Sequence, residues 1–391
     1  MLLAPAPDAV LDLTRDLVRH NTTNPPGNET PAIAMLAERL RGWGFETVVV
    51  PYPVGDAPDN RTQVVARLRG TGERPGLLFS GHVDVVPIGE ARWSVEPFAA
   101  EVRGDRLYGR GSCDMKGGVA ALVEAAGALA RAGRPLKGDL VVALTADEER
   151  NCLGADALVR EPLFDGLGAA IVAEPTDLGI VIAEKGAFWL SIAFLGKMAH
   201  GSMPQLGANA AAAAAEFVYR WEQGYDTTSH RHELLGAPTL NIGAIHGGLK
   251  TNVVPDRCVV ELDMRTTPGV DHADVRAQVE AMLAEVAAAR PGISWEIAVL
   301  SNRAPVGSPA DSDIVRVVGE AARAVAGVDP TPRGVPYCTE ASVWVPVLGL
   351  EMVICGPGAP GMCHQPDEYV PIEQLGQAAA IYARAAEALL L

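Results

Sequence analysis

Histidines and acidic residues stand where several apolar, strand-like runs of the sequence end. The run that begins at Leu77 delivers His82 and Asp84 before Pro87 stops it, and four later segments repeat the pattern. Divalent ions of the zinc type take imidazole nitrogen and carboxylate oxygen, and two such ions about 3.5–4 Å apart can share one carboxylate. The sequence therefore predicts a metal site whose ligands are His82, Asp114, Glu149, Glu174 and His364.

The adjacent pair Glu148 and Glu149 offers a base beside a ligand. Neighbours on an extended or loop backbone point in opposite directions, so Glu149 can bind metal while Glu148 faces a water molecule as general base. Asp84 follows His82 by two residues on a strand-like stretch and is predicted to hold the second imidazole nitrogen. Each of these motifs alone is explained as well by a surface pair or a solvated turn as by a functional site. Their repeated occurrence at the ends of apolar runs is what favours a site.

Strands and helices alternate in the first part of the chain. Strand-like runs are expected at 47–50, 63–68, 77–80, 140–145 and 169–173, with a helix at 117–132. Several of these runs are too continuously apolar to have a face in water, which predicts an α/β fold whose mixed sheet is covered by helices on both faces. Sites in such sheets form beyond the carboxyl ends of the strands, where these acids and histidines lie.

The pattern changes after Gly186. The expected order is a strand, a helix, two strands, a helix and a strand, at 188–195, 209–222, 239–245, 257–264, 271–289 and 293–299. This order is typical of a ferredoxin-like α+β domain. The proline-containing stretch 302–309 is predicted to be the linker back, because His364 must rejoin the other ligands. We therefore predict a discontinuous catalytic domain, 1–186 and 302–391, interrupted by an inserted domain, 187–301.

Composition narrows the class of protein. The 391 residues are 48% hydrophobic and 20% charged, with a net charge of −16. This length suggests two or three domains, and the negative charge disfavours nucleic acid and anionic membranes as partners. No apolar stretch approaches the ~20 residues of a membrane-spanning helix, and the start lacks the basic segment of a secretory signal. Six scattered cysteines show no disulfide framework. We expect a cytoplasmic protein with reduced, mostly buried thiols.

Seven segments together resemble one known family. They are GHVDVVP, GRGSCDMKGG, TADEE, AEPT, GKMAHGSMPQLGANA, NVVPDRCVVELDMR and GPGAPGMCHQPDEYV. In this order they resemble the dinuclear zinc peptidase and deacylase family that holds acetylornithine deacetylase, succinyl-diaminopimelate desuccinylase, aminoacylases and glutamate carboxypeptidases. The resemblance runs from about residue 9 to the C-terminus. It implies two divalent ions, zinc or else cobalt or manganese, and an inserted lid domain that commonly forms a homodimer.

The resemblance also implies how the ligands divide between the two ions. Asp114 would bridge them, with His82 and Glu174 completing one site. Glu149 and His364 would complete the other. Glu148 matches the family's general base, and Asp84 matches the aspartate that orients the histidine.

Further positions match the family's substrate contacts. His200 would polarise the scissile carbonyl, often in the active site of the partner subunit. Asn252, Arg265 and Thr339 match positions that contact substrate, with the arginine holding a carboxylate. From the residues alone, His200 reads as a surface loop. Arg265 reads equally as an anion anchor or a structural ion pair, since a guanidinium grips a carboxylate with two parallel hydrogen bonds.

The predicted reaction is hydrolysis of the amide bond of a small N-acyl amino acid, or of a dipeptide-like substrate. Within the family, residues 337–341 and 364–369 resemble the pattern of acetylornithine deacetylase more than that of the desuccinylase. The desuccinylase pattern resembles Thr-Ser-Asp at the first of these places, and this chain departs from it. A desuccinylase, a broader aminoacylase and a metallocarboxypeptidase stay open. Two other classes are a thiol hydrolase using Cys113 or Cys338, and a non-catalytic binding protein on the same fold.

Overall fold

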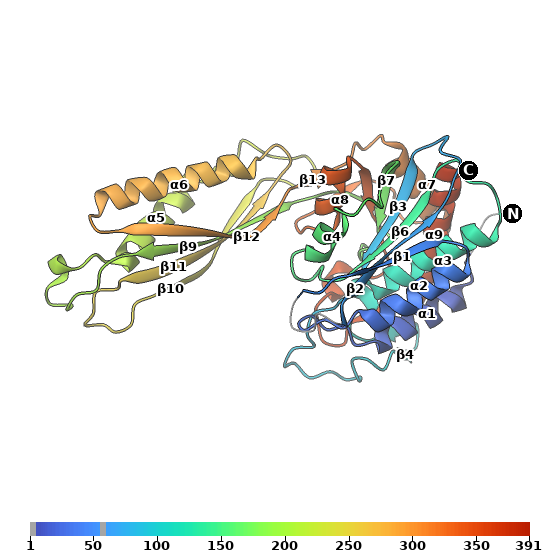
Figure 1. The fold of residues 1–391 in the computed structure, drawn as a ribbon, viewed down its shortest axis with the longest axis horizontal. Coiled ribbons are helices and arrows are strands. Elements are labelled where there is room, and N and C mark those ends of the chain that lie inside the picture. The colour runs from blue at the N-terminus through green and yellow to red at the C-terminus, as the bar shows by residue number, and fades with distance from the viewer. Residues whose placement is uncertain (1–4, 55–59) are drawn as a thin grey trace. The chain divides into compact units, whose positions relative to one another are not determined.

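The computed structural model describes residues 5–54 and 60–391 and divides into two compact units. The first unit comprises Met1–Ile182, Gly307–Arg333 and Thr339–Leu391. The second comprises Ala183–Val306 and Gly334–Cys338. Figure 1 draws both, with the chain coloured from blue at the N-terminus to red at the C-terminus.

A nine-stranded mixed sheet forms the centre of the first unit. Its strands are β1 (Glu46–Pro51), β2 (Thr62–Leu68), β3 (Gly76–His82), β6 (Leu140–Thr145), β7 (Leu167–Val172), β8 (Val181–Glu184), β13 (Val306–Gly307), β14 (Arg333–Val335) and β15 (Glu351–Ile354). They lie in the order β1-β2-β6-β3-β7-β15-β8-β13, with β14 beside β8. The neighbouring pairs β6–β3, β3–β7 and β7–β15 are parallel, so the carboxyl ends of four central strands meet at one edge.

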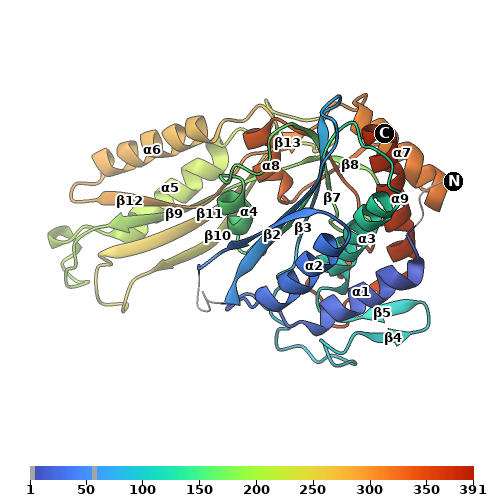
Figure 2. The same cartoon turned by 45° about the vertical axis from the view of Figure 1, so that its right-hand side comes forward.

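Helices cover both faces of this sheet, as predicted. They are α1 (Pro7–Arg19), α2 (Thr30–Gly42), α3 (Gly117–Arg131), α4 (Leu153–Leu158), α7 (Asp313–Ala326), α8 (Ala341–Leu348) and α9 (Ile372–Leu390). Figures 1 and 2 show α1, α2, α3, α7 and α9 on one face and α4 and α8 on the other. Every residue of β3 and β6 is buried, which is the physical reason for their unbroken apolar sequences. The predicted fold class is confirmed.

Helix α3 approaches the end of β7 very closely. A Cβ atom on Gly118, in the first turn of α3, would lie 2.1 Å from the carbonyl oxygen of Ala173, just beyond β7. Only glycine allows this approach without displacing backbone. The contact matters for the site because Asp114 lies three residues before the start of α3 and Glu174 directly follows Ala173.

A small second sheet joins two distant segments of the first unit. Its strands are β4 (Glu101–Arg103), β5 (Arg106–Tyr108) and β16 (Tyr369–Pro371), in the order β16-β5-β4. Tyr369 pairs with Tyr108 in antiparallel register. The segments that follow β5 and precede β16 therefore lie side by side.

The second unit has the predicted element order. Its elements are β9 (Gly186–Leu195), α5 (Ala210–Gly224), β10 (Thr239–Gly247), β11 (Arg257–Thr266), α6 (His272–Ala289) and β12 (Ser294–Arg303). The four strands form an antiparallel sheet in the order β10-β11-β9-β12. Apolar side chains of α5 and α6 pack with those of the strands around Phe194 and Phe217 in one buried cluster.

The predicted linker 302–309 is wrong at its start. Strand β12 continues to Arg303, which pairs with Ala187. The sequence suggested an earlier end because polar Ser301 and Asn302 follow the apolar run, and an irregularity between Val299 and Ser301 shifts the register there. Ladder pairing with β9, which the apolar pattern does not report, extends the strand.

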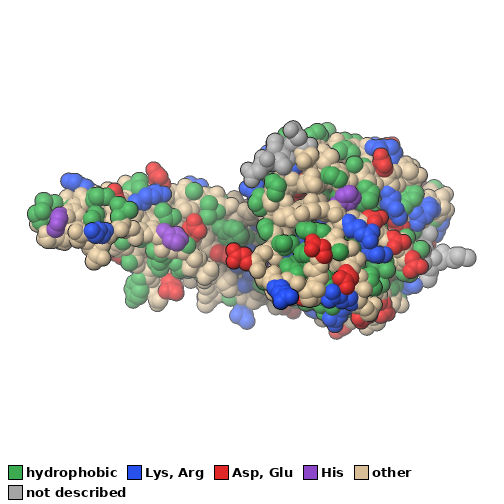
Figure 3. Space-filling model, turned by 90° about the horizontal axis from the view of Figure 1, so that it is seen from below, with side chains coloured by type: hydrophobic (Ala, Val, Ile, Leu, Met, Phe, Trp, Pro, Cys, Tyr) green, Lys and Arg blue, Asp and Glu red, His purple; other side chains and the backbone are tan. Residues whose placement is uncertain are grey.

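Two further features are the hydropathy of the helices and the distribution of charged side chains on the surface. No helix in 5–54 or 60–391 is both long and apolar enough to cross a membrane. On the face that Figure 3 shows, acidic and basic side chains are interspersed.

Candidate metal centre

The carboxyl ends of three parallel strands carry predicted site residues. His82 is the last residue of β3, Glu148 and Glu149 follow β6, and Glu174 follows β7. Asp114 comes from a distorted turn, Ser112–Lys116, in which its own backbone is extended (φ −118°, ψ 99°) rather than helical. The irregular backbone turns this carboxylate away from the helix that follows.

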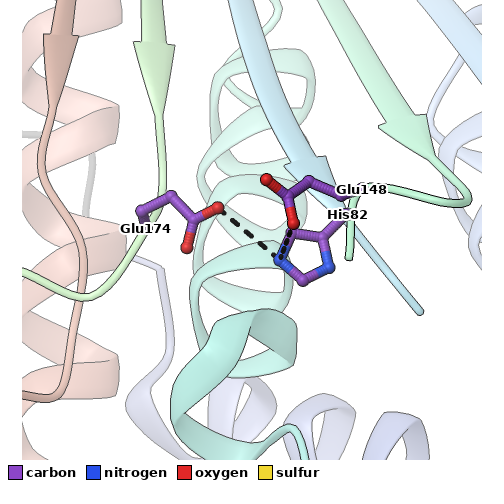
Figure 4. A group of neighbouring side chains, drawn as sticks. All are labelled: His82, Glu148 and Glu174. Atoms are coloured by element: carbon purple, nitrogen blue, oxygen red, sulfur yellow. Dashed lines mark ion pairs between the residues drawn. The ribbon is translucent and has the colours of Figure 1, made fainter. Parts of the chain in front are cut away.

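One group of side chains gathers around His82. Its Nε2 atom lies 3.2 Å from Asp114 Oδ1, 3.5 Å from Glu174 Oε1 and 3.9 Å from Glu148 Oε2. Figure 4 shows the carboxylates of Glu148 and Glu174 both directed towards the same nitrogen of His82. Of the three carboxylates, Glu148 is the farthest from the nitrogen.

A second group gathers around His364. Its Nε2 atom lies 3.4 Å from Asp114 Oδ2 and 3.1 Å from Glu149 Oε2. Asp114 thus presents Oδ1 to His82 and Oδ2 to His364. One carboxylate is shared between two imidazole-containing groups.

These separations fit divalent ions. With metal–ligand bonds of 2.0–2.2 Å, the ligand atoms of a tetrahedral site lie roughly 3.3–3.6 Å apart. The five contacts of the two Nε2 atoms with Asp114, Glu149 and Glu174 fall between 3.1 and 3.5 Å. Ligand atoms of His82, Asp114 and Glu149, and of His82, Glu148 and Glu174, also lie within 4.8 Å of one another. The donor set is that of a zinc-type ion, so the residues fit the predicted cofactor.

Several carboxyl groups are buried close together at this centre, and burial raises the pKa values of two of them. Burial raises the pKa of Glu174 to about 7, and the Asp114 charge adds to the rise while His82 opposes it. Burial also raises the pKa of Glu148 well above its ordinary value, against the influence of His82. Clustered buried carboxylates favour protonation unless a cation compensates them, and a divalent ion would supply that charge.

Asp84 contacts the second imidazole nitrogen and has a further task that was not predicted. Its backbone carbonyl lies 3.0 Å from His82 Nδ1, and its carboxylate oxygen Oδ1 pairs with the same nitrogen at 3.6 Å. The carboxylate also accepts the backbone N–H groups of Glu148 and Glu149, at 3.1 and 3.2 Å. Asp84 therefore orients the two glutamates together with the histidine.

A buried polar network supports this turn from behind. Asn24 donates to Asp84 at 2.9 Å and to Asp147 at 2.6 Å. Asp147, whose φ of 62° is unusual for a residue other than glycine, also accepts hydrogen bonds from Tyr52 and Arg61. Sequence reasoning missed these partners, although Asp147 stands beside Glu148 in the same acidic segment.

We predict that Arg61→Met strongly destabilises the protein. Arg61 is fully buried and bonds Glu29 with two nitrogens, at 2.8 and 3.1 Å, and Asp147 at 2.9 Å. Removing the guanidinium leaves two carboxylates buried without their counter-ion, which costs about 3–5 kcal/mol. Urea unfolding measures this loss. Arg69→Met removes an ion pair to Glu46 that is 60% exposed or more, and is the matched control. Equal losses in the two variants would contradict the prediction.

A further buried carboxylate lies beneath the ligands. Glu340 is completely buried and accepts hydrogen bonds from Ser80 of β3, at 2.7 Å, and from Thr145 of β6. Ser80 lies two residues before His82, and Thr145 pairs with His82 in the sheet. Thr339 is also buried, and its hydroxyl accepts the N–H of Ala341 at the start of α8.

The other predicted substrate residues lie in the second unit. His200 is exposed, and its Nδ1 accepts the Ser202 backbone N–H at 3.2 Å. In the neutral ring the proton then sits on Nε2, which becomes a hydrogen-bond donor. The side chain of Asn252 is exposed, and its backbone carbonyl accepts the backbone N–H of Gly201.

Arg265 has an intramolecular partner. Its Nε lies 2.8 Å from Asp263 Oδ1, its Nη2 donates to Asp263 Oδ2 at 3.2 Å, and the guanidinium stacks over Trp189. Both the arginine and the aspartate keep 25–30% of their side chains exposed.

Comparison with known proteins agrees with the fold and the donor set. The model of peptidase family M20/M25/M40 matches residues 78–388. Acetylornithine deacetylase of Myxococcus xanthus is 35% identical over 379 residues, covering 95% of this chain and 94% of that protein. The chain therefore belongs to peptidase family M20/M25/M40, and is a metal-dependent hydrolase of that family.

Solved structures show the same fold. A tripeptidase from Staphylococcus aureus superposes with a TM-score of 0.78 at 22% identity, covering 99% of each chain. A Bacillus subtilis protein described as a dinuclear metal binding peptidase superposes with a TM-score of 0.73 at 18% identity, covering 98% of each chain.

Proposed function

We propose that the protein hydrolyses the amide bond of an N-acyl amino acid, most closely that of an N-acetylornithine-like substrate. The observation that carries the proposal is Asp114, which faces His82 with one oxygen and His364 with the other, near the more distant carboxylate of Glu148. The likeness to acetylornithine deacetylase over 95% of the chain supports the acyl class.

Five residues would hold two divalent ions, zinc first among them, with cobalt or manganese as alternatives. They are His82, Asp114, Glu149, Glu174 and His364. When bound, such ions polarise a carbonyl group and make water more acidic.

Glu148 would accept the proton of the attacking water and return it to the leaving amine. Its carboxylate lies beside His82, but at 3.9 Å it is the farthest of the three neighbouring carboxylates from Nε2, which suits a base better than a ligand. Burial raises the pKa of Glu148 in the metal-free centre, whereas bound cations would lower it and favour the ionised carboxylate that a general base requires.

The second unit is proposed to be a lid that also forms a homodimer in the cytoplasm. His200 would donate its Nε2 proton to the scissile carbonyl oxygen, because Nδ1 is already an acceptor. Asn252 and Arg265 would contact the substrate, the arginine through its carboxylate, and Thr339 would shape the substrate loop. Asp263, the ion-pair partner of Arg265, would be able to accept an ammonium group of the substrate.

A substrate panel tests the function. N-acetylornithine, other N-acetyl, N-succinyl and N-formyl amino acids and dipeptides are assayed with added zinc or cobalt. We expect kcat/KM to be highest for N-acetylated substrates with a cationic side chain. Preference for N-succinyl substrates or dipeptides would contradict the proposed N-acetyl specificity but would still be consistent with metal-dependent amide hydrolysis. Loss of activity on thiol alkylation with indifference to chelators would instead favour a thiol hydrolase.

A further inference from the structure

We propose that Glu368 and Arg110 are positioning residues that set His364 against Asp114 and thereby fix the affinity for the second ion. This inference rests on the proposed two-ion site. It assigns a role to a pair of residues that bind neither ion nor substrate.

Glu368 receives four hydrogen bonds at the segment that carries Asp114. The carboxylate is completely buried, and Oε1 accepts the backbone N–H groups of Cys113 at 2.9 Å and Asp114 at 3.0 Å. Oε2 accepts the N–H of Gly111 at 3.1 Å and a guanidinium N–H of Arg110 at 2.6 Å. A carboxylate that accepts this many hydrogen bonds holds the turn in place.

Gly111 makes this convergence possible. Its φ of 83° is in the left-handed region, and a Cβ there would lie 2.5 Å from Val85 Cγ1. A left-handed residue within a turn directs successive backbone N–H groups to one side, forming an anion-binding concavity. Here the concavity holds the chain's own Glu368 carboxylate, which ties the turn before α3 to the segment that carries His364.

Arg110 extends the connection to two more segments. The side chain is 2% exposed, and Nη1 also donates to Gln365 O at 3.3 Å. Nη2 reaches His364 O at 3.5 Å and Pro87 O at 3.3 Å. One guanidinium therefore connects the loop of His364 with the segment that follows β3.

The two histidines differ in how much they need such support. His82 is buried at the end of a central strand, where its Nδ1 contacts the Asp84 carbonyl. The His364 side chain is 52% exposed, and the φ angle of the residue is 64°. His364 lies on a loop that follows the 3₁₀ turn Pro360–Met362. A strained, exposed residue keeps its place only if its surroundings impose it. We therefore expect loss of the Glu368–Arg110 pair to affect the His364 ion first.

The test measures metal affinity, not only activity. Metal-free protein is titrated with Co²⁺ by calorimetry and absorption spectroscopy, and bound metal is counted after dialysis. In Glu368→Gln and in Arg110→Lys we expect the first ion to bind as in the wild type and the second dissociation constant to rise about 10–100-fold. Glu124→Gln is the control, because Glu124 of α3 is as buried as Glu368 and is paired with Arg39 of α2.

A double-mutant cycle with His364→Ala locates the effect. If Glu368 acts through His364, adding Glu368→Gln to His364→Ala should change the affinity for the remaining ion less than twofold. Equal weakening of both ions, or losses matched by Glu124→Gln, would overturn the inference. Wild-type protein that binds a single ion would overturn the two-ion site itself. Two ions in the wild type with an unchanged second affinity in both variants would overturn this inference alone.

Discussion

Glu148→Gln is expected to lower kcat about 10³-fold while both ions stay bound and KM changes little. The amide has nearly the shape of the carboxylate but cannot take a proton from water. Its few contacts favour a clean substitution: the Cys152 thiol lies 3.4 Å from Oε1, and the Glu148 N–H to Asp84 is a backbone bond that the variant keeps.

The Glu148→Gln variant also distinguishes whether Glu148 acts as the general base or as a metal ligand. Glu148, His82 and Glu174 offer ligand atoms within 4.8 Å of one another, so a metal-binding role for Glu148 has geometric support. If Glu148 were a ligand, the variant would lose metal along with turnover. Steady-state kinetics and metal analysis after dialysis are therefore measured on the same sample. Glu161→Gln, on an exposed glutamate, is the control. Full activity in Glu148→Gln would refute the base assignment.

Asp114→Asn is expected to abolish stoichiometric binding of both ions, and activity with it. Asp114 faces both imidazole groups, and hydrogen bonds from His364 and His82 lower its pKa despite its burial. The neutral amide loses the charge that two cations share and presents one oxygen where the carboxylate presents two. Metal content measured after dialysis against micromolar Zn²⁺ reports the loss.

Chelation of the wild type should reproduce the phenotype reversibly. Activity should vanish with a strong chelator and return when Zn²⁺ or Co²⁺ is added back, whereas Asp114→Asn should not recover. Asp105→Asn, at a side chain that is 92% exposed, is the matched control. A variant that keeps one full equivalent of tightly bound metal would show that Asp114 belongs to a single site.

Much of the centre could be predicted because its signals are local. A buried parallel strand is apolar throughout, so its end is visible in the sequence, and the next polar residues fall at the edge where such sheets bind ligands. The structure places His82, Glu149 and Glu174 at the ends of β3, β6 and β7. His364 was harder to place, because it lies on a loop and reaches the others only through the pairing of β16 with β5.

The amino-acid sequence by itself determined the donor types, the alternation of strands and helices, and the family. Only the tertiary structure decided how these donors are held. Asn24 meets Asp84 across 60 residues, Glu340 meets Ser80 across 260, and Glu368 meets Asp114 across 254. Which carboxylate accepts which N–H depends on packing between segments that share no local pattern. For that reason the sequence predicted the contact of Asp84 with the histidine, but not the hydrogen bonds that its carboxylate accepts from the backbone of the two glutamates.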